Sequence, residues 1–195
     1  AYIKQTVMQK KGNYLAFFPS YRMLQDVMAC TGPQLDTSIR CICQTSGMTE
    51  EEREAFLHEF EQKRKEDEGL LGFCVMGGIF GEGIDLKSSR LIGAVVVGTG
   101  LPMVCTENEL FREYFDKEKG TGFSYAYQYP GMNKVLQAAG RVIRTTDDIG
   151  AILLLDERFL QNSYQQLFPR EWFPHHVVTI DSMKETLEQF WLENT

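Results

Sequence analysis

The chain has 195 residues, of which 43% are hydrophobic and 24% are charged, as in an ordinary globular protein. This length suits one α/β domain with a full core. The net charge of −7 excludes nucleic-acid binding through bulk positive charge, although a local groove of a few contacts stays open. No apolar run is long enough to span a bilayer and the amino terminus lacks the layout of a secretion signal, so we expect a cytoplasmic protein without a membrane partner.

Acidic residues and cysteines are distributed unevenly. Residues 50–68 carry a net charge of −5, which leaves −2 for the rest of the chain, so the remaining surface can be locally basic. The five cysteines include no Cys-x-x-Cys pair, and their spacing indicates free thiols. We therefore expect no metal and no iron–sulfur cluster in this chain.

Strand-like and helix-like segments alternate in the first half of the chain. A strand is expected at residues 14–19, and Ser20 then caps a helix that runs to about residue 30. A second strand is expected at residues 39–43. Thr49 and Glu52 have the spacing of a capping box, which predicts that an acidic helix begins there.

The alternation continues in the second half. Strands are expected at residues 70–76, 91–97, 151–155 and 176–180. Helices are expected at residues 107–120, at residues 133–144 and after Asp181, which we expect to cap the last one. The glycine- and tyrosine-rich residues 120–130 are expected to form a loop.

This alternation predicts an α/β fold, a three-layer domain with a mainly parallel sheet flanked by helices. The whole chain, residues 1–195, is expected to form one domain, with its core at about residues 13–160 and a terminal strand and helix within residues 171–195. In such sheets ligands bind beyond the carboxyl ends of the strands, so the loops after the first, third and fourth strands are the places to look.

Two arginines close the segment from Gln137 to Arg144, and Gly140 precedes the first of them, Arg141. On a helix both guanidiniums would project from one face within a turn of each other. A guanidinium keeps its proton and its planar fork fits phosphate oxygens, so such a pair can neutralise a phosphate during transfer. The alternative is a basic helix end that the helix dipole favours.

The chain lacks a standard phosphate cradle of its own. A P-loop needs a second glycine followed by Lys and Ser or Thr, but Leu86 stands at that glycine in the segment 81–88. The dinucleotide fingerprint also fails at Gly98 and Gly100, where Met103 follows in place of the third glycine.

The segment from Gly77 to Gly83 follows an apolar strand, and Glu82 and Asp85 lie within or just after it. Four glycines permit positive φ and a close approach of the backbone to a partner. This segment is either a tight crossover with solvated acids or a loop that touches a ribose or a nucleic-acid backbone.

Ser20, Tyr21 and Arg22 place a hydroxyl, an aromatic ring and a guanidinium at the carboxyl end of the first strand. The amides of the following helix terminus favour a phosphate, and Tyr21 can stack on a base. The alternative makes Ser20 only a helix cap and Tyr21 a packing residue.

Taken in order, these segments resemble the C-terminal motor domain of DinG/XPD-type superfamily 2 DNA helicases. Residues 14–24 look like motif IV, a strand that ends in Phe-Pro-Ser-Tyr. Residues 81–86 are similar to motif V, in which Glu-Gly-Ile-Asp is characteristic, and residues 137–144 fit motif VI, Gln-x-x-Gly-Arg-x-x-Arg. Leu101-Pro102 fits the family's turn after the fourth strand, and residues 156–159 match its Asp-x-Arg-Phe.

The resemblance implies a RecA-like fold and the second motor half of an ATP-dependent DNA helicase of 5′ to 3′ polarity, cytoplasmic or nucleoid-associated. ATP with Mg would be bound mainly by the first motor domain of the same polypeptide, to which the family's P-loop and iron–sulfur cluster belong. Arg141 and Arg144 would reach the γ-phosphate as arginine fingers, and Gln137 would help to place it.

The resemblance also assigns coupling and DNA contacts. Glu82, Gly83, Asp85 and Gly140 would link the nucleotide state to DNA contact. A track for single-stranded DNA would run along a second set of residues, namely Ser20, Tyr21 and Arg22.

Two other interpretations stay open. The chain can be a self-contained Rossmann-like module that binds a nucleotide or metabolite through Gly98–Gly100. It can also be a non-catalytic docking domain whose acidic helix, within residues 50–68, is the contact surface.

Overall fold

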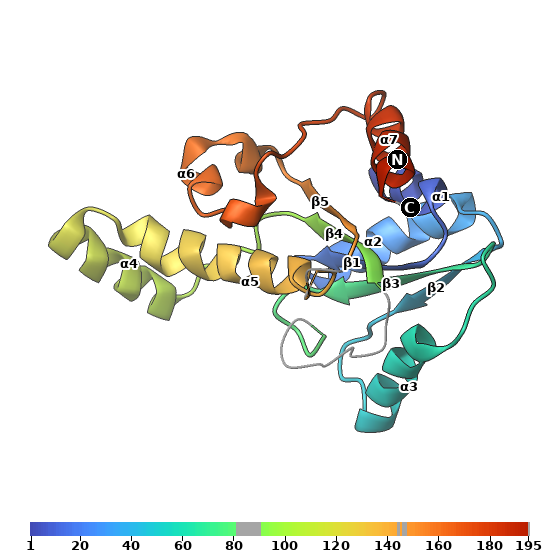
Figure 1. Cartoon of the computed structure of the whole chain (residues 1–195). Coiled ribbons are helices and arrows are strands. Elements are labelled where there is room, and N and C mark those ends of the chain that lie inside the picture. The colour runs from blue at the N-terminus through green and yellow to red at the C-terminus, as the bar shows by residue number, and fades with distance from the viewer. Residues whose placement is uncertain (81–90, 144, 146–147, 195) are drawn as a thin grey trace.

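The computed structural model describes residues 1–80, 91–143, 145 and 148–194 (Figure 1). Its strands form one sheet in the order β2-β3-β1-β4-β5, and each neighbouring pair is parallel. The strands are β1 (Asn13–Phe18), β2 (Ile39–Cys43), β3 (Gly69–Val75), β4 (Leu91–Val97) and β5 (Ala151–Leu155). The expected α/β fold with a parallel sheet is confirmed.

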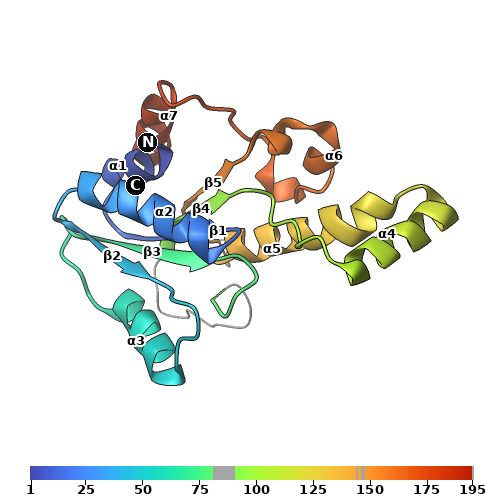
Figure 2. The ribbon, with the colours of Figure 1, turned by 180° about the vertical axis from the view of Figure 1, so that it is seen from behind.

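Helices cover both faces of this sheet (Figures 1 and 2). One face buries side chains of α1 (Tyr2–Gln9) and α2 (Tyr21–Thr31), and the other buries side chains of α3 (Glu50–Glu61) and α5 (Tyr129–Ala139). The strands are apolar on both sides for this reason: in β1, Leu15 and Phe17 face α3 and α5, whereas Tyr14, Ala16 and Phe18 face α1 and α2.

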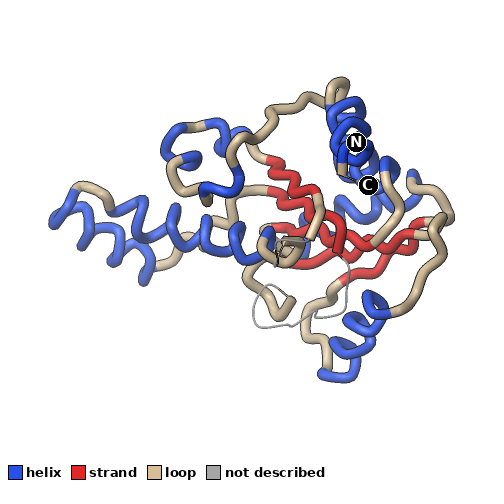
Figure 3. Tube along the Cα trace, viewed as in Figure 1, coloured by secondary structure: helices blue, strands red, loops and turns tan. Residues whose placement is uncertain are grey.

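The remaining elements extend from this core. They are α4 (Thr106–Lys119), a π-helical segment (Ser124–Gln128), short 3-10 turns, α6 (Asn162–Gln165) and α7 (Met183–Glu193). Helix α7 lies beside α1, so the two termini are close together (Figure 3). The ammonium of Lys10 lies 4.3 Å from the ring centroid of Trp191 and joins them.

Two predicted helix starts are confirmed in detail. The hydroxyl of Ser20 accepts a hydrogen bond from the Met23 amide at 3.3 Å and caps α2. Thr49 and Glu52 form the complete capping box of α3, with each side chain accepting from the other residue's amide.

The prediction of a loop at residues 120–130 is wrong, because most of these residues are helical. Gly120 ends α4 in the left-handed conformation, and the chain then returns through the π-helical segment directly into α5. The two limbs form an arm that projects from the sheet, most clearly in Figures 1 and 2. Tyr125 stacks on Phe115 at 4.3 Å and Tyr127 donates to Glu109 at 2.5 Å, so tertiary contacts outweigh the loop-like composition.

The strand expected at residues 176–180 is also wrong, since none of these residues is in a strand. His176 and Val177 are exposed, and the following helix packs on α1 rather than extending the sheet. The predicted last helix exists, but Ser182 rather than Asp181 is its N-cap residue. Helix α1 was not expected from the sequence, and it buries Ile3 and Val7 against the sheet.

Candidate functional site

The carboxyl ends of β1, β2, β3 and β4 meet along one edge of the sheet, which we call the carboxyl edge (Figure 1, where strands are arrows). The described segments that leave these ends contain polar side chains and glycines with positive φ. Parallel α/β sheets bind their ligands at this edge. The carboxyl edge is therefore the first candidate site.

Ser20, Tyr21 and Arg22 leave the end of β1 as predicted. Ser20 is exposed but its hydroxyl caps α2, and Arg22 is exposed at the same helix terminus. The Tyr21 ring is half-buried and its hydroxyl accepts a hydrogen bond from Gln44 Nε2 at 3.0 Å. The three residues lie together at the carboxyl edge, and two of them already have structural partners.

Gln44, directly after β2, connects three elements of this edge. Its side chain is only 2% exposed, its Oε1 accepts from the Val75 amide at 2.8 Å, and its Nε2 donates to Tyr21. The Gln44 amide itself donates to the Phe73 carbonyl at 2.8 Å, so the side chain extends the β2–β3 ladder by one further bond. Gln44 thus fixes the start of α2 relative to the end of β3.

Lys134 crosses the carboxyl edge from α5. A Cβ atom placed on Gly77 would lie 3.0 Å from Lys134 Cε and 3.1 Å from its Cδ, so the lysine stem lies close against this glycine. Gly77 has φ +66 and follows the end of β3. A Cβ atom on Gly100, just after β4, would lie 3.4 Å from Lys134 Cβ. The lysine stem is therefore held across the ends of two strands.

The described part of the carboxyl edge is free of carboxylates where β1 to β4 end. Residues 18–22, 44–49, 76–80 and 98–105 contain no Asp or Glu, in a chain whose net charge is −7. The acid after β5, Asp156, accepts from both Nε and NH2 of Arg158 at 2.8 and 2.7 Å. These hydrogen bonds from Arg158 lower the pKa of Asp156 below its ordinary value. The described residues after β1 to β4 thus present no negative charge that would repel a polyanion.

Residues 137–143 lie elsewhere, and the helix expected at residues 133–144 is wrong beyond Ala139, so Arg141 does not lie on a helix face. Helix α5 ends at Ala139, Gly140 is its C-cap residue, and Arg141 lies in the turn that follows. The Gly140 amide still donates an α-helical bond to the Leu136 carbonyl at 2.8 Å, but the next two amides donate only three residues back, Arg141 to Ala138 at 3.4 Å and Val142 to Ala139 at 3.1 Å, so the helix tightens into a turn and ends. Gln137 is exposed in the last helical turn and Arg141 is half-buried.

Helix α5 runs antiparallel to the strands, so its end lies at the opposite edge. Val142 lies against Gly150, whose added Cβ would be 2.3 Å from Val142 Cγ1 and 3.0 Å from the Ile92 carbonyl. Gly150 precedes β5 and Ile92 is the second residue of β4. Arg141, next to Val142, therefore lies near the amino ends of the strands, apart from Ser20 and Tyr21.

Four predicted site residues lie outside the described residues: Glu82, Gly83, Asp85 and Arg144. Their predicted roles stay predictions. The structure brings Ser20, Tyr21 and Arg22 together with Gln44, and it separates this group from Gln137, Gly140 and Arg141.

The turn Gly98–Gly100 is filled by the protein itself. Gly98 and Gly100 have φ +81 and +65, but a Cβ on Gly100 would lie 2.8 Å from the Gly131 carbonyl. No helix begins at this turn, because α4 starts only at Thr106. These glycines permit the close approach of α5 and present no helix terminus to a phosphate.

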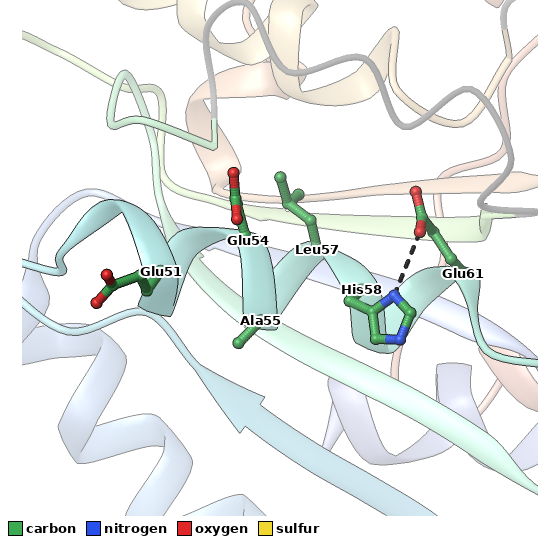
Figure 4. Close-up of a pocket in the computed structure, with 6 residues that line it drawn as sticks. All are labelled: Glu51, Glu54, Ala55, Leu57, His58 and Glu61. Carbon is green, nitrogen blue, oxygen red and sulfur yellow. Dashed lines mark hydrogen bonds and ion pairs between the residues drawn. The ribbon is translucent and has the colours of Figure 1, made fainter.

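The described part of the chain offers no metal site and no membrane-spanning helix, and one further hollow lies on its surface. No group of three or more His, Cys, Asp or Glu side chains there could hold a metal ion. No described helix is both long and apolar enough to cross a membrane. A shallow hollow lies over α3 alone, lined by Glu51, Glu54, Ala55, Leu57, His58 and Glu61 (Figure 4).

Sequence reasoning missed Gln44 and Lys134. The signal for Gln44 was its place directly after a predicted strand, where side chains of a parallel sheet reach the ligand edge. Lys134 is the single charged residue of α5, and a lone cation on an otherwise uncharged helix was the signal there.

The chain is a RecA-like α/β domain, with this strand order and with helices on both faces of the sheet. Residues that could bind phosphate lie at both edges of its sheet. A model of the helicase C-terminal domain family matches residues 3–175. The chain therefore belongs to this family, as a C-terminal helicase domain of the DinG/XPD type.

Similar proteins agree with this assignment. The regulator of telomere elongation helicase 1 homologs of Drosophila yakuba and Drosophila grimshawi are 30% and 31% identical over 175 residues, or 84% of this chain. The chain spans only 17% of the length of each of these relatives. A solved XPD helicase structure has a TM-score of 0.65 and 23% identity, over 85% of this chain and 28% of that one, and supports the same fold. A second, of XPD without ligand, has the same TM-score at 22% identity over 85% of this chain and 32% of its own.

Proposed function

We propose that the chain is the second motor half of an ATP-dependent DNA helicase whose first half holds ATP and Mg. The observation that carries this proposal is the family match over residues 3–175. The sequence also contains arginines that can bind phosphate but no P-loop or dinucleotide-binding fingerprint. ATP binding would close the two halves, and the cleft motion would move single-stranded DNA along the carboxyl edge with 5′ to 3′ polarity.

Arg141, together with Arg144, is proposed to supply arginine fingers to that ATP. The reason is chemical: a guanidinium keeps its charge and donates two parallel hydrogen bonds to phosphate oxygens as negative charge develops on them. Gln137 lies exposed one turn earlier and would orient the γ-phosphate. Among the described members of this donor set, Gln137 lies in the last turn of α5 and Arg141 lies in the turn that follows, and both side chains can donate to phosphate oxygens.

Ser20, Tyr21 and Arg22 are proposed as part of the DNA track. The α2 terminus presents amides that favour a phosphate, Arg22 is exposed beside it, and the edge lacks carboxylates from β1 to β4 in the described residues. Glu82, Gly83, Asp85 and Gly140 are proposed to couple this track to the nucleotide.

The decisive experiment measures DNA-stimulated ATP turnover in the complete helicase polypeptide. Arg141→Ala should lower turnover by about 10³-fold or more, the range typical of arginine fingers, while folding is retained. Arg53→Ala on α3, whose guanidinium pairs with Glu50, is the control and should leave turnover unchanged. Turnover near the unmodified level in Arg141→Ala would refute the assignment.

A second experiment tests the division of labour between the halves. The 195-residue chain alone should hydrolyse no ATP, because it lacks a P-loop. Tight binding of ATP or NAD by the chain alone would favour the self-contained module instead. The Gly98–Gly100 turn weighs against that alternative, since Gly131 fills it.

A further inference from the structure

We propose that Lys134 is a phosphate contact for single-stranded nucleic acid, binding a backbone phosphodiester at the carboxyl edge. This inference rests on the proposed DNA-translocating function and adds a contact on α5 to it. No motif that identifies the family includes this position, and the observations that carry it are geometric and electrostatic.

The first observation is the placement of the lysine stem. Lys134 is half-buried, and its Cδ and Cε lie against Gly77 at the end of β3. A stem held in this way loses little conformational freedom when its ammonium binds an anion. The ammonium follows Cε by one bond, so it also lies at the Gly77 turn.

The second observation is the absence of a counter-charge. Lys134 makes no ion pair within the described part of the chain, whereas Arg40, Arg64, Arg112 and Arg158 all have carboxylate partners. The segments that follow β1 to β4 offer no carboxylate among their described residues. Among the described residues, no carboxylate therefore competes with an external anion for this half-buried cation.

The third observation is continuity with the proposed track. The Gly77–Gly78 turn lies between Lys134 on one side and Gln44 on the other, since a Cβ on Gly78 would lie 3.1 Å from Gln44 Nε2. The same Nε2 atom donates to Tyr21 at 3.0 Å. Lys134 and Tyr21 thus lie on either side of the Gly77–Gly78 turn. A single DNA strand bound along the carboxyl edge would pass Tyr21 and then reach Lys134.

ATP is the other possible source of the phosphate that Lys134 would bind. The separation between Lys134 and the proposed ATP contact, Arg141, argues against ATP as that source. Lys134 lies five residues before the end of α5, about 7.5 Å along the helix axis, and Arg141 lies in the turn beyond that end. Arg141 lies near the amino ends of β4 and β5, whereas Lys134 lies at the carboxyl edge. The two cations therefore serve different phosphates, and Lys134 serves the nucleic acid.

The test uses the complete helicase polypeptide and a fluorescent oligothymidylate, with binding followed by anisotropy from about 50 to about 200 mM salt. Each phosphate contact on a single strand contributes about −0.7 to the slope of log K against log salt. Lys134→Gln keeps most of the stem and should reduce the slope by about 0.7 and weaken binding on the order of threefold. Lys134→Arg should retain the slope.

Two controls separate the possible results. Lys63→Gln, an exposed lysine after α3, should leave the slope unchanged. An unchanged slope in Lys134→Gln overturns the inference, even if its melting temperature falls, because packing alone then explains the lysine. A raised KM for ATP in Lys134→Gln, with an unchanged salt slope for DNA binding, also overturns the inference, because Lys134 would then contact a phosphate of ATP. If the unmodified helicase shows no salt-dependent DNA binding, the proposed function itself fails.

Discussion

Gln44 is the side chain whose removal should most clearly reveal how the carboxyl edge is built. Gln44→Met keeps a similar volume but removes both the acceptor for the Val75 amide and the donor to Tyr21. The Val75 amide would then lack its partner at the end of β3. The change therefore tests the polar network while largely keeping the packing.

The expected magnitude follows from these two hydrogen bonds. A buried donor left without a partner costs about 1–3 kcal/mol, and a second lost hydrogen bond adds about 1 kcal/mol. We expect Gln44→Met to lower the free energy of unfolding by about 2–4 kcal/mol. Tyr21→Phe removes only the second bond and should cost about 1 kcal/mol.

Urea unfolding of the 195-residue chain measures these losses, and amide hydrogen exchange at Val75 reports the site directly. Gln25→Met on α2 is the matched control, since Gln25 is exposed, and should change stability by less than about 0.5 kcal/mol. The double variant should cost less than the sum of the two single changes, because they share one bond. Unchanged exchange at Val75 with a loss below about 0.5 kcal/mol would refute this account of the edge.

Two further predictions concern the arm and the end of β5. Gly122→Ala should destabilise the chain by about 1–3 kcal/mol in urea unfolding, because the added Cβ would lie 2.1 Å from the Arg112 carbonyl. Gly32→Ala meets nothing within 4 Å and should be neutral or slightly stabilising; equal costs for both would contradict this. Arg158 lowers the pKa of Asp156 from 3.8, so the pair stabilises the fold above that pH and the gain is lost as pH falls through the lowered pKa. Arg158→Gln should raise the pKa of Asp156 in a carboxyl titration by NMR, and an unchanged pKa would contradict the pairing.

The strands and the helices that cover them could be predicted because their signals are local. Runs such as residues 91–97 are apolar because both faces of the sheet are covered, and a capping box such as that of Thr49 works within one turn. The arm could not be predicted in this way. Residues 120–130 are helical because aromatic rings pack on α4, a contact with no local pattern in the sequence.

The candidate site was predictable in its residue types but not in its layout. The pattern of glycine and arginine in residues 137–144 indicated phosphate chemistry and also predicted one helical face for both arginines. Gly140 ends the helix before Arg141, and only the antiparallel packing of α5 places that arginine at the far edge. Gln44 matters through contacts with Val75 and Tyr21, which are far from it in sequence.

Helix α5 joins the two proposed contacts, and this arrangement explains how they could act together. Gly131, near its start, lies against the turn that follows β4, and Lys134, at its middle, reaches the turn that follows β3. At its end, Gly140 turns the chain into Arg141. Buried side chains between them, at Val135 and Ala138, hold the helix on the sheet. A packed helix moves as a unit, because displacing one end alone would break its core contacts. The proposed shift of Arg141 toward ATP would therefore also move the carboxyl edge. Helix α5 would in this way couple the proposed DNA contact, Lys134, to the proposed arginine finger, Arg141.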